Sequence, residues 1–491
     1  MQISAYGSQD IALTGNPQIS FFKGVYYRYT NFSIETMENL FSTEPGFGRR
    51  CEVKINKTGD LLSKMYLSTT LPALNNNGLN NNEGNNLTPN NTNFQYLGWV
   101  NKVGHALIKS AELRIGGEII DKHYSEWLEI WSSLTRQGGK EEAYQELVGE
   151  YSGGPGSNYN TTNHTAADDN PLSTIQATIG GVTINVENSG LGEAARSSGL
   201  VSKNLLIPLH FWFCRDYGSS LPMIALNHQE VKLTIEFRAL DELVKSHDDN
   251  VNLNDANGEL PRLTNTSLLV DYIYLDTEER KVFAEKKHEY LIDQLQYDGG
   301  GETMNLNGNL FETNLGFSQP IKELFWTITN EDYLIKNKVT GNRLLDTDSS
   351  EFLIGNNPVF DGTNRSHFAR MSEFTSAVIK VNGVNRFTPR NALYFRNLQP
   401  LNHHTSVPMF VSNVKKNTKR SKGIYCYSFS LRPEENQPSG SLNFSCLDNS
   451  SLHLTFPARP NNHPQMRLKV FALNYNVLKI NSGMCGLAYS N

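Results

Sequence analysis

The clearest pattern in this 491-residue sequence is a strict alternation of apolar and polar side chains. In "VKLTIEF", Val231, Leu233, Ile235 and Phe237 share one face, and Lys, Thr and Glu occupy the other. Successive side chains of a strand point to opposite faces of a sheet, so the pattern predicts a half-buried antiparallel strand. Near the end, "MRLKVFALNYNVLKI" also alternates but changes phase after Val470, which predicts a strand with a bulge or bend near that residue.

A chain of this length is too long for one ordinary hydrophobic core, so we expect at least two. Its 24 Phe, 21 Tyr and 38 Gly are typical of strands joined by turns. Only 19% of the residues are charged, and the net charge is -6. This balance argues against a protein that coats a phosphate backbone, so we expect no direct nucleic-acid binding.

The chain also resembles itself at two places, in the same order. "SAELRIGGEII", from Ser110, is similar to "SAVIKVNGVNRF", from Ser376, and in each a short alternating strand precedes a turn that contains Gly. "VKLT" at Val231 is likewise similar to "LHLT" at Leu452. The spacings of the two pairs differ by about the length of a polar insertion at residues 149–198. One duplicated all-β unit, with a longer first copy, explains these similarities.

Helical spacing is confined mainly to "YSEWLEIWSSL". There Tyr124, Trp127, Leu128, Trp131 and Leu134 would line one face of a helix. We predict one short helix, with its tryptophans anchored in a core.

Three polar segments predict two loops and a linker. Residues 75–93 and 149–198 are rich in Asn, Gly, Ser and Thr, and we expect both to be exposed loops. Residues 245–262 are the best candidate linker. The predicted domains are therefore 1–243, with an N-terminal arm and the long insertions, and 244–491, which begins with the linker.

No motif for catalysis or ligand binding stands out. The Gly-rich stretches "YSGGPGS" and "DGGGE" match neither a phosphate-binding loop nor a dinucleotide-binding turn, and we interpret them as turns. His403 and His404 would point to opposite faces of an extended strand, and no spaced carboxylates accompany them. The acidic pairs at 168–169 and 248–249 are typical of solvated loops. The sequence thus predicts no catalytic, cofactor-binding or metal-binding residue, and no cofactor.

The N-terminal residues indicate synthesis in the cytosol. The N-terminus has no charged region followed by an apolar run, and no apolar window is long enough to cross a bilayer. We therefore expect the Asn-x-Ser/Thr triplets to be accidental. The five cysteines lie far apart without a CxxC pair, so we expect free, buried thiols at Cys51, Cys214, Cys426, Cys446 and Cys485.

The stretch "TGNPQISFFKGVYYRYTNF", residues 14–32, combines six aromatic rings with two cations. Odd positions from Ile19 to Tyr29 form a largely apolar face, which favours a strand. Stacking of nucleic-acid bases would instead require a basic groove around the rings. Because even positions also carry rings, we expect a neighbouring domain or subunit to cover the outer side.

The longer segment "YGSQDIALTGNPQISFFKGVYYRYTNFSIE", residues 6–35, closely resembles the N-terminal signature of the major capsid proteins of the nucleocytoplasmic large DNA viruses. Four later segments resemble the same family, in its order: "LHFWFCRDYGSSLPMIALNHQEVKLTIEF", "NGVNRF", "QPLNHHT" and "RPEENQPSGSLNFSCLDNSSLHL". The resemblance spans nearly the whole chain, and it departs at residues 75–93 and 149–198.

This resemblance implies an all-β fold, a double jelly roll of two eight-stranded antiparallel β-sandwiches in one chain, with long surface loops and few short helices. It implies a structural major capsid protein of a large icosahedral double-stranded DNA virus, and no enzyme. Three copies would form a pseudo-hexagonal capsomer, and capsomers would tile the outer shell of a virion assembled in the host cytoplasm. Neighbouring capsomers, minor capsid proteins and penton proteins are the other partners implied, with an internal viral membrane nearby. "NPQI", near the start, would lie on the inner side.

Two other functions remain open for a jelly roll with polar loops. A carbohydrate-binding or receptor-binding module is one, because the same fold serves lectins. A cupin-like metal enzyme is the other, although the sequence lacks the spaced His and Glu ligands that it needs. Glycan binding by an isolated trimer would favour the first, and metal retained through dialysis would favour the second.

Overall fold

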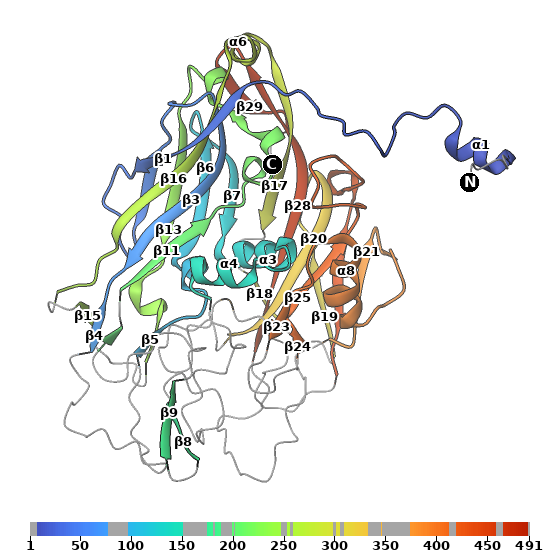
Figure 1. The fold of residues 1–491 in the computed structure, drawn as a ribbon. Helices are drawn as coiled ribbons and strands as arrows, with labels where there is room; N and C mark the ends of the chain where they lie inside the picture. Colours follow the sequence, from blue (N-terminus) through green and yellow to red (C-terminus); the bar gives the residue numbers. More distant parts are fainter. Residues whose placement is uncertain are drawn as a thin grey trace.

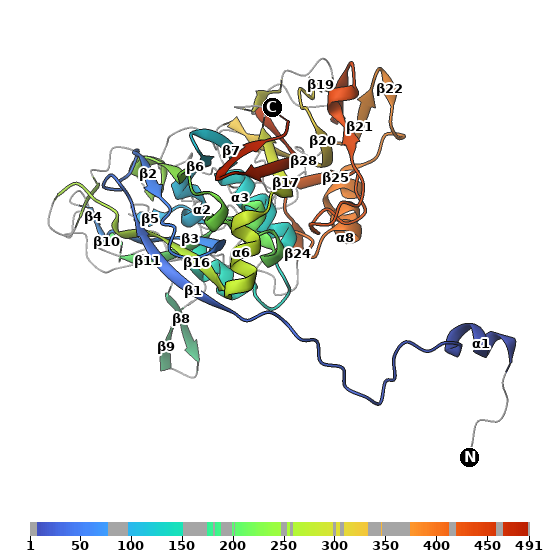
Figure 2. The same ribbon diagram turned by 90° about the horizontal axis from the view of Figure 1, so that it is seen from above.

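The computed structural model describes residues 7–76, 97–150, 174–179, 182–187, 199–200, 202–246, 253–255, 259–297, 301–304, 309–331, 345, 374–411, 419–457 and 465–489. Strands of the first half and strands of the second half form two stacks that lie side by side when viewed from above (Figure 2). An N-terminal arm, residues 7–31, leaves the first half and extends away from the body (Figure 1).

Two antiparallel sheets form the first sandwich. The larger has the order β1 (Phe32–Leu40), β16 (Thr264–Leu275), β3 (Leu61–Leu71) and β11 (Lys203–Pro208), and β12 (Leu221–Pro222) also pairs with β3. The smaller has the order β2 (Arg50–Lys54), β13 (Val231–Phe237), β6 (Ile108–Ile115) and β7 (Glu118–Tyr124). As predicted, the four apolar residues of "VKLTIEF" on β13 are buried in the first core.

The second sandwich repeats this plan. Its larger sheet has the order β17 (His288–Tyr297), β28 (Met466–Asn481), β20 (Pro320–Asn330) and β25 (Ile424–Ser428); β18 (Glu302–Thr303) and β29 (Met484–Leu487) pair with β28, and β26 (Leu442–Asn443) with β20. Its smaller sheet has the order β19 (Leu310–Asn314), β27 (Ser450–Thr455), β21 (Ser376–Val381) and β22 (Val384–Asn385). Trp326, Phe395 and Leu452 lie in the second core.

Chain order and sheet order agree strand by strand between the halves, which confirms the predicted duplication. The two similar "SA" segments form equivalent hairpins, β6–β7 and β21–β22. Their turns use residues with positive φ, Gly116-Gly117 in one and Asn382-Gly383 in the other. Two consecutive positive φ angles give the turn whose twist matches that of the flanking strands. The VKLT and LHLT segments likewise occupy equivalent strands, β13 and β27.

Strand β28 corrects one prediction. Its pairing with β17 and β20 shows no register shift at Val470 itself, and the irregularity near it lies on β20 between Ile321 and Glu323, opposite Leu473 and Asn474, so the phase change does not come from a bulge of β28 at Val470. The apolar pattern changes phase because both faces of the strand are covered. Leu468 and Val470 point into the second core, whereas Phe471 and Leu473 pack on the opposite face of the sheet.

The predicted loops and linker lie largely outside the described residues. Within the first loop, β4 (Leu74–Asn76) pairs with β10 (Gly199–Leu200) and β15 (Leu253–Asp255); within the second, β8 (Thr174–Ile179) pairs with β9 (Val182–Glu187). In the linker, β14 (Val244–Ser246) pairs with β5 (Leu97–Trp99). Strand β16, which follows the linker, belongs to the first large sheet and pairs with β1 from Ser267 to Leu275. We propose that the halves divide at α6 (Thr277–Glu285) rather than at residue 243.

The helices of the described residues are few and short, as expected. They are α1 (Ser8–Thr14), α2 (Val103–Leu107), α3 (Ser125–Thr135), α4 (Glu141–Val148), α5 (Trp212–Arg215), α6 and α8 (Gln399–His403), with a π-helical turn η4 (Tyr394–Leu398) and 3₁₀ turns η1 (Tyr217–Ser219), η2 (Met223–Ala225), η3 (Leu240–Glu242) and η5 (Phe444–Cys446). Helix α3 confirms the helix predicted from "YSEWLEIWSSL". None of the helices in the described ranges is long and apolar enough to cross a membrane.

Candidate assembly surfaces

The joint between the two sandwiches is built on α3, which follows β7 of the first half directly. Its residues Trp127, Ile130, Trp131 and Leu134 are buried against the second large sheet, on the face opposite the second core. Their partners on that face are Leu295, Phe325, Ile424, Cys426, Phe471 and Leu473. The rings of Trp127 and Phe325 meet edge to face, with centroids 5.2 Å apart. One half of the chain thus covers a sheet of the other half.

Buried charges reinforce this joint. The carboxylate of Glu129, on α3, accepts hydrogen bonds from Nζ of Lys102 at 2.6 Å and Nζ of Lys422 at 2.9 Å. Lys422 lies just before β25, so its pair with Glu129 crosses between the halves. Burial alone would raise the pKa of Glu129, but Lys102, Lys422 and the hydrogen bond from His105 hold it well below its usual value. The carboxylate is therefore ionised and paired, as a buried charge must be.

Two further ion pairs cross the same joint. Glu126, at the start of α3, pairs with Lys469 of β28. Burial opposes its charge, yet Lys469 and Arg238 lower the pKa of Glu126 to about 2. Arg215, on α5, donates to Asp293 of β17 at 3.1 Å. Apolar packing and paired charges together indicate that the two sandwiches form one rigid block.

The N-terminal arm corrects the strand predicted for Ile19–Tyr29. These residues form no strand, and β1 begins only at Phe32. The arm's rings are 84% to 101% exposed at Phe21, Phe22, Tyr26, Tyr27 and Tyr29. An isolated exposed ring is ordinary, but a run of five on one segment marks an interaction surface. Within the described residues no other part of the chain covers these rings, so the expected covering domain is not found there, and a covering subunit stays a prediction.

A second exposed apolar surface lies on the far side of the second sandwich, around η4 and α8. We call it the α8 patch, and it consists of Leu393, Leu398, Leu401 and Leu431, which are 43% to 74% exposed. Leu398 and Leu401 are three residues apart and share one side of the helical segment. Leu431 lies alongside because its carbonyl oxygen is 3.1 Å from Nδ1 of His403 at the end of α8.

A buried histidine fixes the C-terminal end of α8. Nε2 of His404 lies 2.8 Å from Oε1 of Glu323 on β20, and Nδ1 lies 2.8 Å from Oε1 of Glu434. Burial disfavours the imidazolium, but the two carboxylates raise the pKa of His404 well above its usual value. A charged imidazole between two carboxylates ties the patch to the sheet beneath it.

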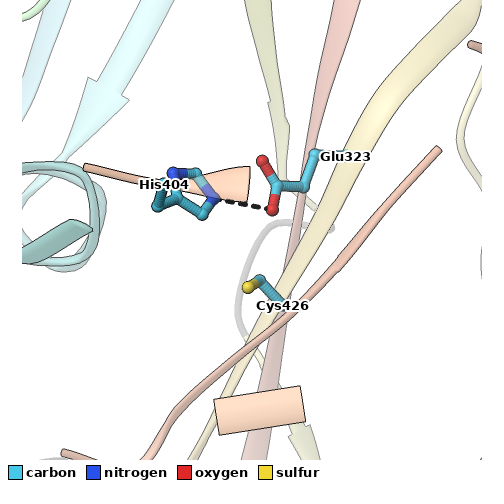
Figure 3. Close-up of side chains that lie close together, drawn as sticks. All are labelled: Glu323, His404 and Cys426. Atoms are coloured by element: carbon cyan, nitrogen blue, oxygen red, sulfur yellow. Dashed lines mark hydrogen bonds and ion pairs between the residues drawn. The ribbon is translucent and has the colours of Figure 1, made fainter. Parts of the chain in front are cut away.

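Three side chains that could bind a metal ion also meet around His404. Ligand atoms of Glu323, His404 and Cys426 lie within 4.8 Å of one another, and the sulfur of Cys426 points toward the other two (Figure 3). Both ring nitrogens of His404 are engaged by carboxylates, and burial raises the pKa of the Cys426 thiol to about 12. The geometry fits an ion-paired imidazolium, and the absence of metal-binding residues stays a prediction. His403 and His404 do not lie on an extended strand, as assumed, but at the end of α8.

A third exposed apolar surface is the outer face of the first large sheet. Met37 on β1 packs on the first core, so its alternate neighbours point outward. Phe32, Ile34 and Leu40 occupy outward positions and are 42% to 72% exposed. The polar side chains of Thr36 and Asp271, bonded at 2.6 Å, lie between them. Sequence patterns could not identify this face or the α8 patch, because alternation does not show which outer face is covered.

The other residues considered from the sequence add no site. The acidic pairs at 168–169 and 248–249, the "YSGGPGS" turn and most of "DGGGE" lie outside the described residues. All five cysteines are free, as predicted, but burial is confirmed only for Cys51, Cys426 and Cys485. Cys214 is half-buried, and Cys446 is exposed.

Comparison with known proteins shows which family the chain belongs to. Residues 20–276 match the family model described as the major capsid protein N-terminus, and residues 279–486 match the model of the large eukaryotic DNA virus major capsid protein. The chain belongs to this major capsid protein family. The junction between the two models falls at α6, where we propose that the halves divide.

Individual relatives agree along the whole chain. The major capsid protein of Pyramimonas orientalis virus is 37% identical over 502 residues, covering 100% of this chain and 99% of that protein. The major capsid protein of Paramecium bursaria Chlorella virus 1 is 30% identical over 518 residues, with the same coverage. These relatives confirm the resemblance seen in the N-terminal signature. The chain is a structural component of a large DNA virus capsid, and not an enzyme.

Solved structures confirm the fold. A quasi-atomic model of the capsid of Paramecium bursaria Chlorella virus 1 has a TM-score of 0.66 at 27% identity, and it covers 96% of this chain and 100% of that chain. The Faustovirus major capsid protein has a TM-score of 0.64 at 13% identity, which supports the fold alone. The two strand-by-strand equivalent sandwiches are thus those of a double jelly roll.

Proposed function

We propose that three copies of this chain form a pseudo-hexagonal capsomer, and that many capsomers tile the outer shell of a large icosahedral double-stranded DNA virus. The duplicated architecture supports this proposal. Because each copy contributes two similar sandwiches held side by side, three copies present six similar units around one axis. We place the protein in the virion after assembly in the host cytoplasm.

The exposed N-terminal arm is the observation that carries the proposal of lattice contacts. Complete burial of one Phe or Tyr ring stabilises an assembly by roughly 1.5 to 3 kcal/mol. The five arm rings are almost fully exposed, and none of them belongs to either core of the described residues. Burial of the arm against another molecule would therefore supply binding free energy that the described part of the chain does not use.

We propose that the arm binds a neighbouring capsomer, a minor capsid protein or a penton protein on the inner side of the shell, near an internal viral membrane. In this arrangement Asn16–Ile19, the "NPQI" segment, lies toward that side. The arm is not needed to fold the body, because its rings lie outside both cores.

Deleting residues 1–18 tests the role of the arm. We expect a folded trimer with the thermal unfolding midpoint of the full chain, but loss of shell assembly when it replaces the full chain in an infected cell, as seen by electron microscopy. A full-length chain with Phe21→Ser and Phe22→Ser should show the same separation between folding and assembly. An unfolded product, or normal shells from both variants, would contradict this role.

A further inference from the structure

The joint inside one chain indicates how two chains meet. In the first half, α3 lies between β7 and β11 and covers the outer face of the second large sheet. In the second half, η4 and α8 lie between β22 and β25, the strands equivalent to β7 and β11. The elements equivalent to α3 in the second half are therefore η4 and α8, and they carry the exposed α8 patch.

The surface that would receive this patch is present on the first half. The first large sheet is equivalent to the sheet that α3 covers, yet its β1 strand leaves Phe32, Ile34 and Leu40 exposed on the outer face. Each chain thus contains one satisfied contact between a helix and a sheet. It also exposes both halves of a second such contact at opposite ends of the molecule.

We propose that the α8 patch of one copy docks on the outer face of β1, β16 and β3 of the next copy, which repeats between chains the contact that α3 makes within one chain. The inference rests on the proposed capsomer and assigns its contact surfaces. Such a head-to-tail contact uses two different surfaces, and repetition of it closes a ring when the rotation allows. Alternating intrachain and interchain contacts would then relate six sandwiches in a trimer.

The composition of the two outer faces supports this assignment. The face under α3 presents Phe325, Phe471 and Leu473, and it is buried as soon as the chain folds. The free face likewise mixes apolar residues with the polar pair Thr36 and Asp271, as the face under α3 mixes its rings with Lys469 and Asp293. Contacts between separately folded subunits are more polar than a domain core, because both surfaces must stay soluble until they meet.

Two double variants test the contact from both sides. The donor variant, Leu398→Asp with Leu401→Asp, changes the α8 patch, and the acceptor variant, Ile34→Asp with Leu40→Asp, changes the β1 face. Leu260→Asp is the matched control, because Leu260 is 79% exposed and belongs to neither surface. Since all five leucine and isoleucine side chains are substantially exposed, we expect each variant to keep the circular dichroism spectrum of the wild type.

Native mass by light scattering across a concentration series is the measurement. We expect the donor and acceptor variants each to weaken trimer formation by at least about 100-fold, since two central apolar residues become charged. The control should match the wild type. A mixture of the donor and acceptor variants retains one intact contact, so it should give a heterodimer of about 110 kDa, twice the chain mass of 55.2 kDa.

Three results separate the possible failures. If the donor and acceptor variants trimerise as well as the wild type, the assigned contact surfaces are wrong, but the proposed capsomer stands. Variants that stay monomeric even when mixed at high concentration overturn the head-to-tail arrangement. A wild type that is monomeric at every concentration overturns the capsomer itself.

Discussion

Replacing Trp127 by Ala tests whether α3 holds the two sandwiches together. Trp127 is fully buried, and its ring centroid lies 5.4 Å from that of Trp131 and 5.2 Å from that of Phe325. Removing a large buried aromatic side chain costs about 3 to 5 kcal/mol, because lost transfer free energy and a residual cavity add. We expect the free energy of unfolding to fall by that amount, with the loss concentrated where the halves meet.

Trp127→Phe is the matched control. Among the described residues, the indole N–H of Trp127 has no hydrogen-bond partner. The Phe variant keeps most of the apolar contact and removes this desolvated donor. The lost packing and the relieved desolvation offset each other, so the free energy of unfolding should fall by less than about 1.5 kcal/mol.

Urea unfolding followed by circular dichroism and tryptophan fluorescence distinguishes these outcomes. The Ala variant should show a lower first midpoint and a wider separation between the transitions of the two halves than the Phe variant. Equal midpoints for wild type, Phe and Ala would refute the assignment of α3 as the joint, whatever the stability of either half.

Three other predictions concern single side chains. The pKa of Glu126 is lowered from 4.5 to about 2 in the folded chain, so its charge stabilises the fold at neutral pH by about 3 kcal/mol, and this stabilisation is lost as the pH falls from about 5 to 2. Glu126→Gln should therefore flatten the dependence of the unfolding free energy on pH over that range. An unchanged slope would count against the pair with Lys469. His404→Gln should lower the free energy of unfolding in urea by about 3 kcal/mol, because the buried carboxylate of Glu323 and the half-buried carboxylate of Glu434 lose their cation. His403→Gln should lower it by less than about 1 kcal/mol. Similar costs for the two variants would disprove the anchoring role. A thiol reagent should label Cys446 quickly and the other four cysteines slowly, since only Cys446 is exposed; rapid labelling that persists in Cys446→Ser would contradict the structure.

Much of the fold could be predicted because local pattern and tertiary environment agree there. The apolar face of Val231–Phe237 faces a core in a sheet with one solvated side, so alternation alone located the strand. The two hairpins at Ser110 and Ser376 share turns that require positive φ, so they stayed recognisable as a repeat. Helix α3 combines a helical period with two tryptophans, and both are buried.

The remaining errors of prediction concern segments whose environment the local sequence does not determine. Some are covered by a distant part of the chain, and others are not covered by any described part. The alternation of β28 changes phase because α3 covers its second face, and this contact joins residues far apart in sequence. Residues 19–29 alternate like a strand, but no neighbouring strand pairs with them in the described structure. His404 is buried between Glu323 and Glu434 because α8 ends there, which adjacency to His403 could not indicate.

Formation of a trimer from two-sandwich chains is the central claim, and the native mass of the purified wild-type protein tests it most directly. Light scattering over a range of concentrations should give about 166 kDa, three times the chain mass of 55.2 kDa. A mass that stays at 55.2 kDa at every concentration would contradict the capsomer and the contacts inferred from it.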